Sequence, residues 1–118
     1  MTLFKLKSRQ WIVDSHGDII IGEGRKEILE NIEKTGSMNQ TAKLMKMSYK
    51  GVWSKIKASE KYLKTRIVST DRQKGTHLTK EGKELLERYR VLKEKCLKED
   101  NRIFNRIFSK KKSLKQGK

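Results

Sequence analysis

The sequence of 118 residues contains no proline, one cysteine and only 7% aromatic residues. A single cysteine excludes an internal disulfide framework and a cysteine-rich zinc site. No apolar run approaches the ~18 residues that a membrane-spanning helix needs. The first ten residues are too polar for the hydrophobic region of a signal peptide. We therefore expect a cytoplasmic chain with no metal, no cofactor and no membrane contact.

Acidic and apolar residues are also scarce. Hydrophobic residues make up 34% of the chain, and 14 acidic residues stand against 30 basic ones, for a formal net charge of +16. The length suits one domain with an extension, and a chain of this size buries roughly two-thirds of its unfolded surface. The charge predicts a polyanionic partner.

The basic excess lies in two blocks. Residues 37–66 hold eight basic residues and one acidic residue, and residues 101–118 hold seven basic residues and no acidic one. A solvated helix face normally mixes both signs, as residues 80–100 do, so the first block indicates a binding surface. Residues 110–118 are predicted as a basic disordered tail, which either attracts DNA or serves only solubility.

Local patterns predict the elements. Residues 4–21 are predicted as a β-hairpin that turns at 15–18. Residues 25–35 carry an apolar stripe of helical period, and the helix ends at Gly36. Ser37 and Gln40 form a predicted capping box, in which the hydroxyl accepts an amide and the Gln40 side chain reaches back.

The second helix is predicted to be about nine residues long. A third helix follows a tight connection and runs from its Ser48 cap to about residue 63. Residues 67–78 form a small hairpin with a polar tip, and Thr79 caps a long helix with a candidate interruption at 100–101.

Two short helices with a tight connection, followed by a basic-tipped hairpin, are typical of a winged helix-turn-helix. We expect an α+β, mainly helical fold in which residues 1–79 form the DNA-binding domain with an N-terminal hairpin. Residues 80–109 would form a dimerisation helix. The third helix would enter the major groove, and the acidic first helix would lie away from DNA.

Three motifs also resemble a known family. The segments Gly22-Glu23-Gly24-Arg25, Thr35-Gly36-Ser37 through Ala42, and Met47-Ser48-Tyr49-Lys50 through Trp53 resemble the N-terminal domain of ModE-type molybdate-responsive repressors. Leu78-Thr79-Lys80-Glu81-Gly82 resembles the junction between wing and helix in that family and, more loosely, in LysR-type regulators. The resemblance covers roughly residues 4–95.

The resemblance implies a homodimer that binds a palindromic operator, with the helix after the wing contributing to dimerisation. It also implies C-terminal molybdate-binding domains in full-length members. Residues 96–118 do not resemble such a domain, so we find no support in this sequence for a small-molecule effector.

The candidate DNA-binding residues lie at the starts of the second and third helices, along the third helix and in the wing: Ser37, Asn39, Gln40, Ser48, Tyr49, Lys50, Gly51, Ser54, Lys55, Lys57, Arg72 and Lys74. The alternatives are plain capping for the serines, a solvated face for the lysines and a flexible turn for the wing. Tyr49 and Trp53 would either stack on DNA or complete the core.

Apolar residues recur at spacings of three and four along the long helix, close to a heptad seam. The candidate dimerisation residues are Leu85, Tyr89, Leu92, Cys96, Ile103 and Ile107. The seam would pack on a second copy or on its own domain. We favour a second copy, because thirty residues at 1.5 Å each span roughly 45 Å. A helix of that length is too long for so small a body to cover.

The function that follows is a sequence-specific DNA-binding transcriptional regulator. One alternative is a nucleoid-type or RNA-binding basic protein without an operator, and another is an interaction module whose long helix docks a different regulator. The sequence contains no paired carboxylates, nucleophile constellation or supported phosphate loop, so we expect no enzyme.

Overall fold

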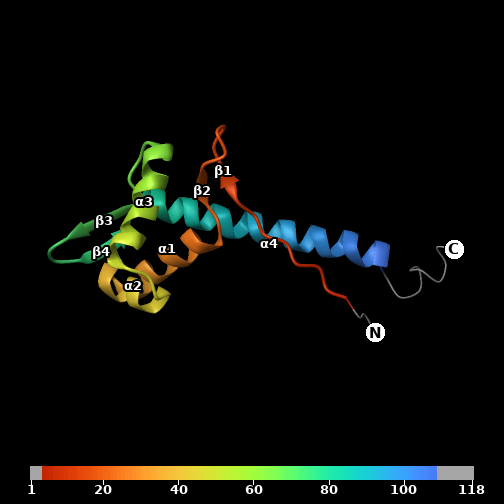
Figure 1. The fold of residues 1–118 in the computed structure, drawn as a ribbon, viewed down its shortest axis with the longest axis horizontal. Coiled ribbons are helices and arrows are strands. Elements are labelled where there is room, and N and C mark those ends of the chain that lie inside the picture. The colour runs from red at the N-terminus through yellow and green to blue at the C-terminus, as the bar shows by residue number, and fades with distance from the viewer. Residues whose placement is uncertain (1–3, 109–118) are drawn as a thin grey trace.

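A computed structural model describes residues 4–108. The elements are β1 (Ile12–Val13), β2 (Ile19–Ile21), α1 (Glu23–Thr35), α2 (Met38–Met45), α3 (Tyr49–Leu63), β3 (Val68–Asp71), β4 (Gly75–Leu78) and α4 (Lys80–Phe108). Helices α1–α3 gather at one end with the β3–β4 wing, and α4 projects away from them (Figure 1). The predicted mainly helical fold with winged helix-turn-helix order is confirmed. The predicted tail, residues 110–118, lies outside the described residues.

The core joins the three short helices, the wing and the first half of α4. It consists of Ile21, Ile28, Leu29, Ile32, Met38, Ala42, Val52, Ile56, Ile67, Val68, Leu78, Leu86 and Tyr89. The second half of α4 contributes nothing to this cluster, so it extends beyond the body that the core holds together. Within residues 4–108, no helix is both long enough and apolar enough to cross a membrane.

The ends of the short helices follow the predicted local chemistry, with one exception. Gly36 adopts a left-handed φ of 68° after α1, and the Ser37 hydroxyl accepts the Gln40 amide at 3.1 Å. The reciprocal half of the predicted capping box is wrong. The Ser37 amide donates instead to the Thr35 hydroxyl at 3.1 Å, which leaves the Gln40 side chain exposed.

Caps also set the start of α3 and α4. The Ser48 hydroxyl accepts the Gly51 amide at 2.9 Å, and the Thr79 hydroxyl accepts the Gly82 amide at 3.0 Å. The wing strands pair from Val68 with Leu78 to Asp71 with Gly75, so they run closer to the tip than predicted. Helix α4 is continuous through residues 100–101, and the predicted interruption there is wrong.

The N-terminal hairpin is shorter than the predicted 4–21. Only Ile12–Val13 and Ile19–Ile21 pair, while residues 4–10 run along α4 (Figure 1). The Ser8 hydroxyl donates to Asp100 Oδ2 at 2.8 Å, and the Tyr89 hydroxyl donates to the Gln10 carbonyl at 2.7 Å. These two bonds join segments far apart in the sequence, which local patterns do not report.

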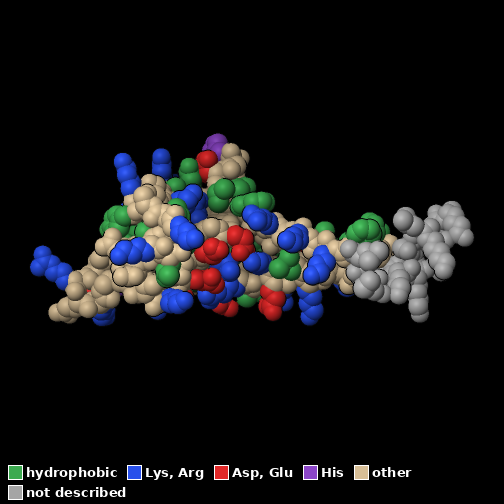
Figure 2. Space-filling view, turned by 60° about the horizontal axis from the view of Figure 1, so that its bottom comes forward, with side chains coloured by type: hydrophobic (Ala, Val, Ile, Leu, Met, Phe, Trp, Pro, Cys, Tyr) green, Lys and Arg blue, Asp and Glu red, His purple; other side chains and the backbone are tan. Residues whose placement is uncertain are grey.

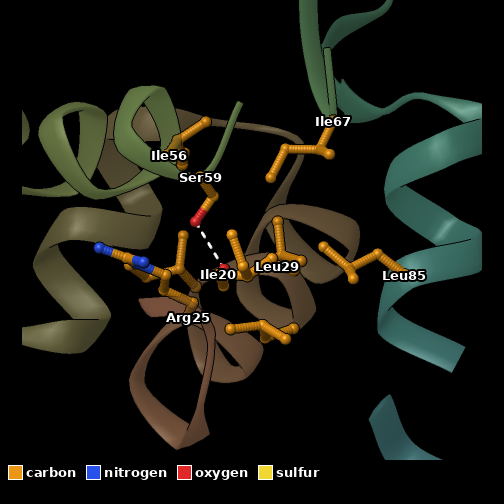
Figure 3. Close-up of a pocket in the computed structure, with 9 residues that line it drawn as sticks. Ile20, Arg25, Leu29, Ile56, Ser59, Ile67 and Leu85 are labelled. Atoms are coloured by element: carbon orange, nitrogen blue, oxygen red, sulfur yellow. Dashed lines mark hydrogen bonds between the residues drawn. The ribbon is translucent and has the colours of Figure 1, made fainter. Parts of the chain in front are cut away.

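The hairpin is attached to the helices at its second strand. The Ser59 hydroxyl of α3 donates to the Ile20 carbonyl at 2.6 Å (Figure 3), and the Arg25 guanidinium of α1 donates to the Ile19 carbonyl. Ile20 and Ile21 are buried, whereas Ile19 is exposed. The hairpin base is therefore held against α1 and α3.

Candidate nucleic-acid interface

The exposed face of α3 carries basic and hydroxyl side chains on successive turns. Lys50, Ser54, Lys57 and Lys61 are all exposed. Their spacings of three and four place them on one side of the helix. The opposite side of α3 buries Val52 and Ile56, so this element presents one polar face and one core face.

The only acidic residue between positions 37 and 66 is turned inward. The Glu60 side chain is 9% exposed, and its Oε2 accepts the amides of Ile67 at 2.8 Å and Val68 at 3.2 Å. Its Oε1 lies 3.3 Å from Lys57 Nζ. The carboxylate thus joins the end of α3 to the start of the wing, and Lys57 is the lysine of residues 37–66 that pairs with it.

Three α3 candidates have intramolecular partners of their own. Lys57 Nζ lies 4.8 Å from the centroid of the Trp53 ring, and Trp53 packs against the core. The Ser54 hydroxyl donates to the Lys50 carbonyl at 2.8 Å. A Cβ on Gly51 would lie 2.9 Å from Ser48 Oγ, so this glycine makes room for the cap of α3. Tyr49 is about half exposed.

The remaining predicted DNA contacts lie at the start of α2 and at the wing tip. Asn39 and Gln40 are exposed beside the Ser37 cap, and Arg72 and Lys74 are exposed at the tip. The Thr76 amide donates to the Gly36 carbonyl at 3.0 Å, which ties the wing to the turn between α1 and α2. At the tip, the Asp71 carboxylate accepts backbone amides, and these hydrogen bonds hold its pKa below the usual value. The amide of Lys74 has the largest effect.

Lys55 lies apart from the other α3 candidates. It is exposed, but it lines a surface hollow together with Trp11 and Arg25. The sequence indicated Lys55 for the recognition face and gave no role to Trp11 or Arg25. Their proximity depends on the attachment of the hairpin to α1 and α3, so no local motif could have indicated it.

Three acidic side chains of α1, Glu23, Glu30 and Glu33, pair with basic side chains of α4. Glu23 Oε2 lies 2.6 Å from Lys93 Nζ, and Glu30 Oε2 lies 3.0 Å from Arg90. Hydrogen bonds from Lys93 and, to a smaller extent, from Tyr89 lower the pKa of Glu23. The hydrogen bond that Arg90 donates to Glu30 raises the pKa of Arg90. Figure 2 shows acidic side chains gathered near the middle of one face, with Lys and Arg spread around them.

The predicted dimerisation residues divide into two groups. The prediction that Tyr89 contacts a second copy is wrong. Its side chain is 0% exposed, and its hydroxyl donates to the Gln10 carbonyl and to Glu23 within the same chain. Burial raises the pKa of Tyr89 to about 12. Leu85 packs against the core and Cys96 is partly buried. The exposed group consists of Leu92, Ile103 and Ile107.

Comparison with known proteins identifies the family. The sequence profile described as "Bacterial regulatory helix-turn-helix protein, lysR family" matches residues 25–83, the stretch that holds α2, α3, the wing and most of α1. The chain belongs to this family. A DNA-binding transcriptional regulator of the LysR and ModE type is the function class that this membership supports.

Two curated relatives carry the ModE name. The "Molybdenum transport protein ModE" of Azotobacter vinelandii is 31% identical over 84 residues, which cover 68% of this chain and 31% of the relative. The "Transcriptional regulator ModE" of Yersinia pestis is 38% identical over 72 residues, covering 58% of this chain and 27% of the relative. The chain spans about a third or less of the length of these relatives.

Solved structures share the fold. CbnR, a LysR family transcriptional regulator, superposes with a TM-score of 0.56 at 21% identity over 70% of this chain and 28% of CbnR. The complex of CbnR_DBD with DNA superposes with a TM-score of 0.54 at 22% identity over 67% of this chain and 90% of that domain. These neighbours establish the winged-helix architecture.

Proposed function

We propose that the chain binds a palindromic DNA operator as a homodimer and regulates transcription from it. The observation that carries this proposal is the α3 face, where exposed lysines follow one another while Glu60 is buried beneath them. A basic face whose one neighbouring carboxylate is buried favours a polyanion, and a helix has the dimensions of the major groove.

In this mechanism, phosphate contacts fix the position of the protein and base contacts select the sequence. Residues at the start of α2 and at the wing tip would contact the backbone. Lys50 and Ser54, near the start of α3, would contact base edges. With about six to ten phosphates bound per dimer, affinity should fall roughly 10³–10⁵-fold between 50 and 200 mM salt.

The second half of α4 supports the dimer. Leu92, near the middle of the helix, and Ile103, Ile107 and Phe108, in its second half, are exposed outside the intramolecular core. A second copy packed along this face would remove these side chains from water and hold two α3 helices in a fixed relation. Two-fold symmetry of the protein would then match a palindromic site.

Selection of bound fragments from random duplex DNA tests this function. We expect a palindrome whose half-sites are separated by about 34–36 Å or a multiple of that distance. Recovery of fragments with no shared sequence, bound with a steep salt dependence, would contradict the proposal and favour a nucleoid-type protein.

A further inference from the structure

A surface hollow lies at the base of the N-terminal hairpin, beside α3. Its volume is about 200 Å³, and it is lined by Trp11, Ile19, Gly22, Gly24, Arg25 and Lys55. The lining comes from the hairpin, the start of α1 and the middle of α3. Two of its residues are cationic and none is acidic, which favours an anionic ligand.

Trp11 and Gly22 give the hollow its wall. A Cβ on Gly22 would lie 2.6 Å from Trp11 Cδ1 and 3.1 Å from Nε1, so the indole lies against backbone that only glycine leaves open. Trp11 nevertheless remains 56% exposed. Its indole offers an apolar surface together with one N–H donor.

Arg25 is a fixed cation at this hollow. Its guanidinium donates to the Ile19 carbonyl and points away from the apolar side chains beneath it (Figure 3). A guanidinium carries five N–H donors, so this one bond leaves donors for a ligand. Desolvation lowers the pKa of Arg25, but the group stays charged at neutral pH.

Lys55 connects the hollow with the proposed DNA-binding face. It follows Ser54 directly, which places it about 100° around the helix from Ser54 and roughly 140–160° from Lys50 and Lys57. Trp53 lies on the other flank of that row, where Glu60 joins α3 to the wing. A duplex seated on α3 would therefore have the wing on one side and the hollow on the other.

We propose that this hollow binds a phosphate group of the DNA backbone on the flank of α3 opposite the wing. Lys55 and Arg25 pair with the phosphate, and the Trp11 indole packs on the adjoining sugar or donates to a phosphate oxygen. The inference rests on the proposed function and deepens it. It assigns Lys55 to backbone positioning, whereas Lys50 keeps the role of contacting bases.

The charge of the hairpin limits this contact to the base of the hairpin. Asp14 and Asp18 flank the exposed turn. Asp14 Oδ1 accepts the amides of His16 at 2.8 Å and Asp18 at 2.9 Å. Asp18 lies beside Tyr62, two turns beyond Lys55 on the same side of α3. Because both carboxylates would repel phosphate, the contact is confined to the base of the hairpin, near Lys55 and Arg25.

Salt-dependent binding of variants tests the assignment. Lys55→Ala should weaken binding to operator and random duplexes by the same factor and should reduce the slope of log K against log salt by about 0.9 per bound protomer. Lys98→Ala removes the same charge from an exposed position on α4 and serves as the matched control. An unchanged slope for Lys55→Ala, or a loss confined to the operator, would overturn the inference.

The indole N–H resonance of Trp11 tests the source of the phosphate. Duplex DNA should shift this resonance in the wild-type chain, with a smaller shift in Lys55→Ala, and Trp11→Phe assigns the signal. Saturable binding of inorganic phosphate with the same shift, at equal ionic strength, would point to a free oxyanion site and overturn the DNA assignment. Absence of any DNA binding by the wild-type chain would overturn the proposed function itself, whereas DNA binding with an unmoved Trp11 signal would overturn only the hollow.

Discussion

Glu60 is the residue whose single side chain joins the two parts of the proposed DNA-binding surface. Its carboxylate satisfies two backbone amides where the chain leaves α3 for the wing, and it pairs with Lys57 on the exposed face. One acidic residue in a block of eight basic ones stands out in the sequence. Its burial shows that the residue supports the surface from beneath.

Glu60→Ala should lower the free energy of unfolding by about 1–3 kcal/mol, because it leaves the Ile67 and Val68 amides buried without a partner. Urea unfolding measures this change. Glu60→Gln keeps a carbonyl acceptor and should lose less. Equal stability of the alanine variant and the wild-type chain would show that water replaces the carboxylate.

Single residues were predictable where their role is local. Gly36, Ser48 and Thr79 end or begin helices as the sequence indicated, because a cap needs only its nearest neighbours. Tyr89 was not predictable, because its position in a heptad pattern does not distinguish the chain's own core from a partner. The Gln40 cap failed because Thr35 competes for the same amide.

Among the elements, the close contact between α4 and the start of the wing fixes how the wing is held. A Cβ on Gly82 would lie 2.1 Å from the Ile67 carbonyl oxygen, so the first turn of α4 packs directly against backbone. The Thr79 hydroxyl donates to the Arg66 carbonyl at 2.7 Å in the same region. The glycine that follows the wing is therefore a requirement of packing.

Gly82→Ala should destabilise the chain by about 1–3 kcal/mol or more, since backbone must shift to admit the methyl group. Gly24→Ala is the matched control, because a Cβ at Gly24 meets nothing within 4 Å and alanine favours a helix. Thermal unfolding followed by circular dichroism compares the two. Similar melting temperatures for both variants would contradict the packing argument.

The order and type of the helices and strands could be predicted from the sequence, whereas the path of residues 4–10 could not. Periodic apolar positions and caps predicted the helices and the wing. The N-terminal segment has too little pattern to show that it lies along α4, since its bonds join Ser8 to Asp100 and Gln10 to Tyr89. The hollow near Trp11 is likewise a product of tertiary packing.

The whole molecule is elongated, at 65 × 30 × 22 Å, because α4 extends past the core. The helix has 29 residues and a length of roughly 44 Å at 1.5 Å per residue. Its first half pairs with α1 through Glu23 and Glu30, and its second half carries exposed apolar side chains. This division supports a molecule in which the body around the core binds DNA and the second half of α4 binds a second copy.

Ile103→Asp should convert the proposed dimer into a monomer, because a charge on that face would be buried unpaired on association. Sedimentation equilibrium at micromolar concentration measures the mass. Asn105→Asp adds the same charge at an exposed polar position of α4 and should leave the dimer intact. A monomeric mass for the wild-type chain, or a dimeric mass for Ile103→Asp, would contradict the proposed homodimer.

Competition between operator and random duplex at two salt concentrations tests the central claim, that the exposed face of α3 selects the DNA sequence. Lys50→Ala should reduce discrimination between the two duplexes more than it reduces binding to random DNA, because Lys50 begins that face. Lys43→Ala, on α2, should weaken both complexes by about the same factor. Equal losses for the two variants would contradict the assignment of α3 as the recognition helix.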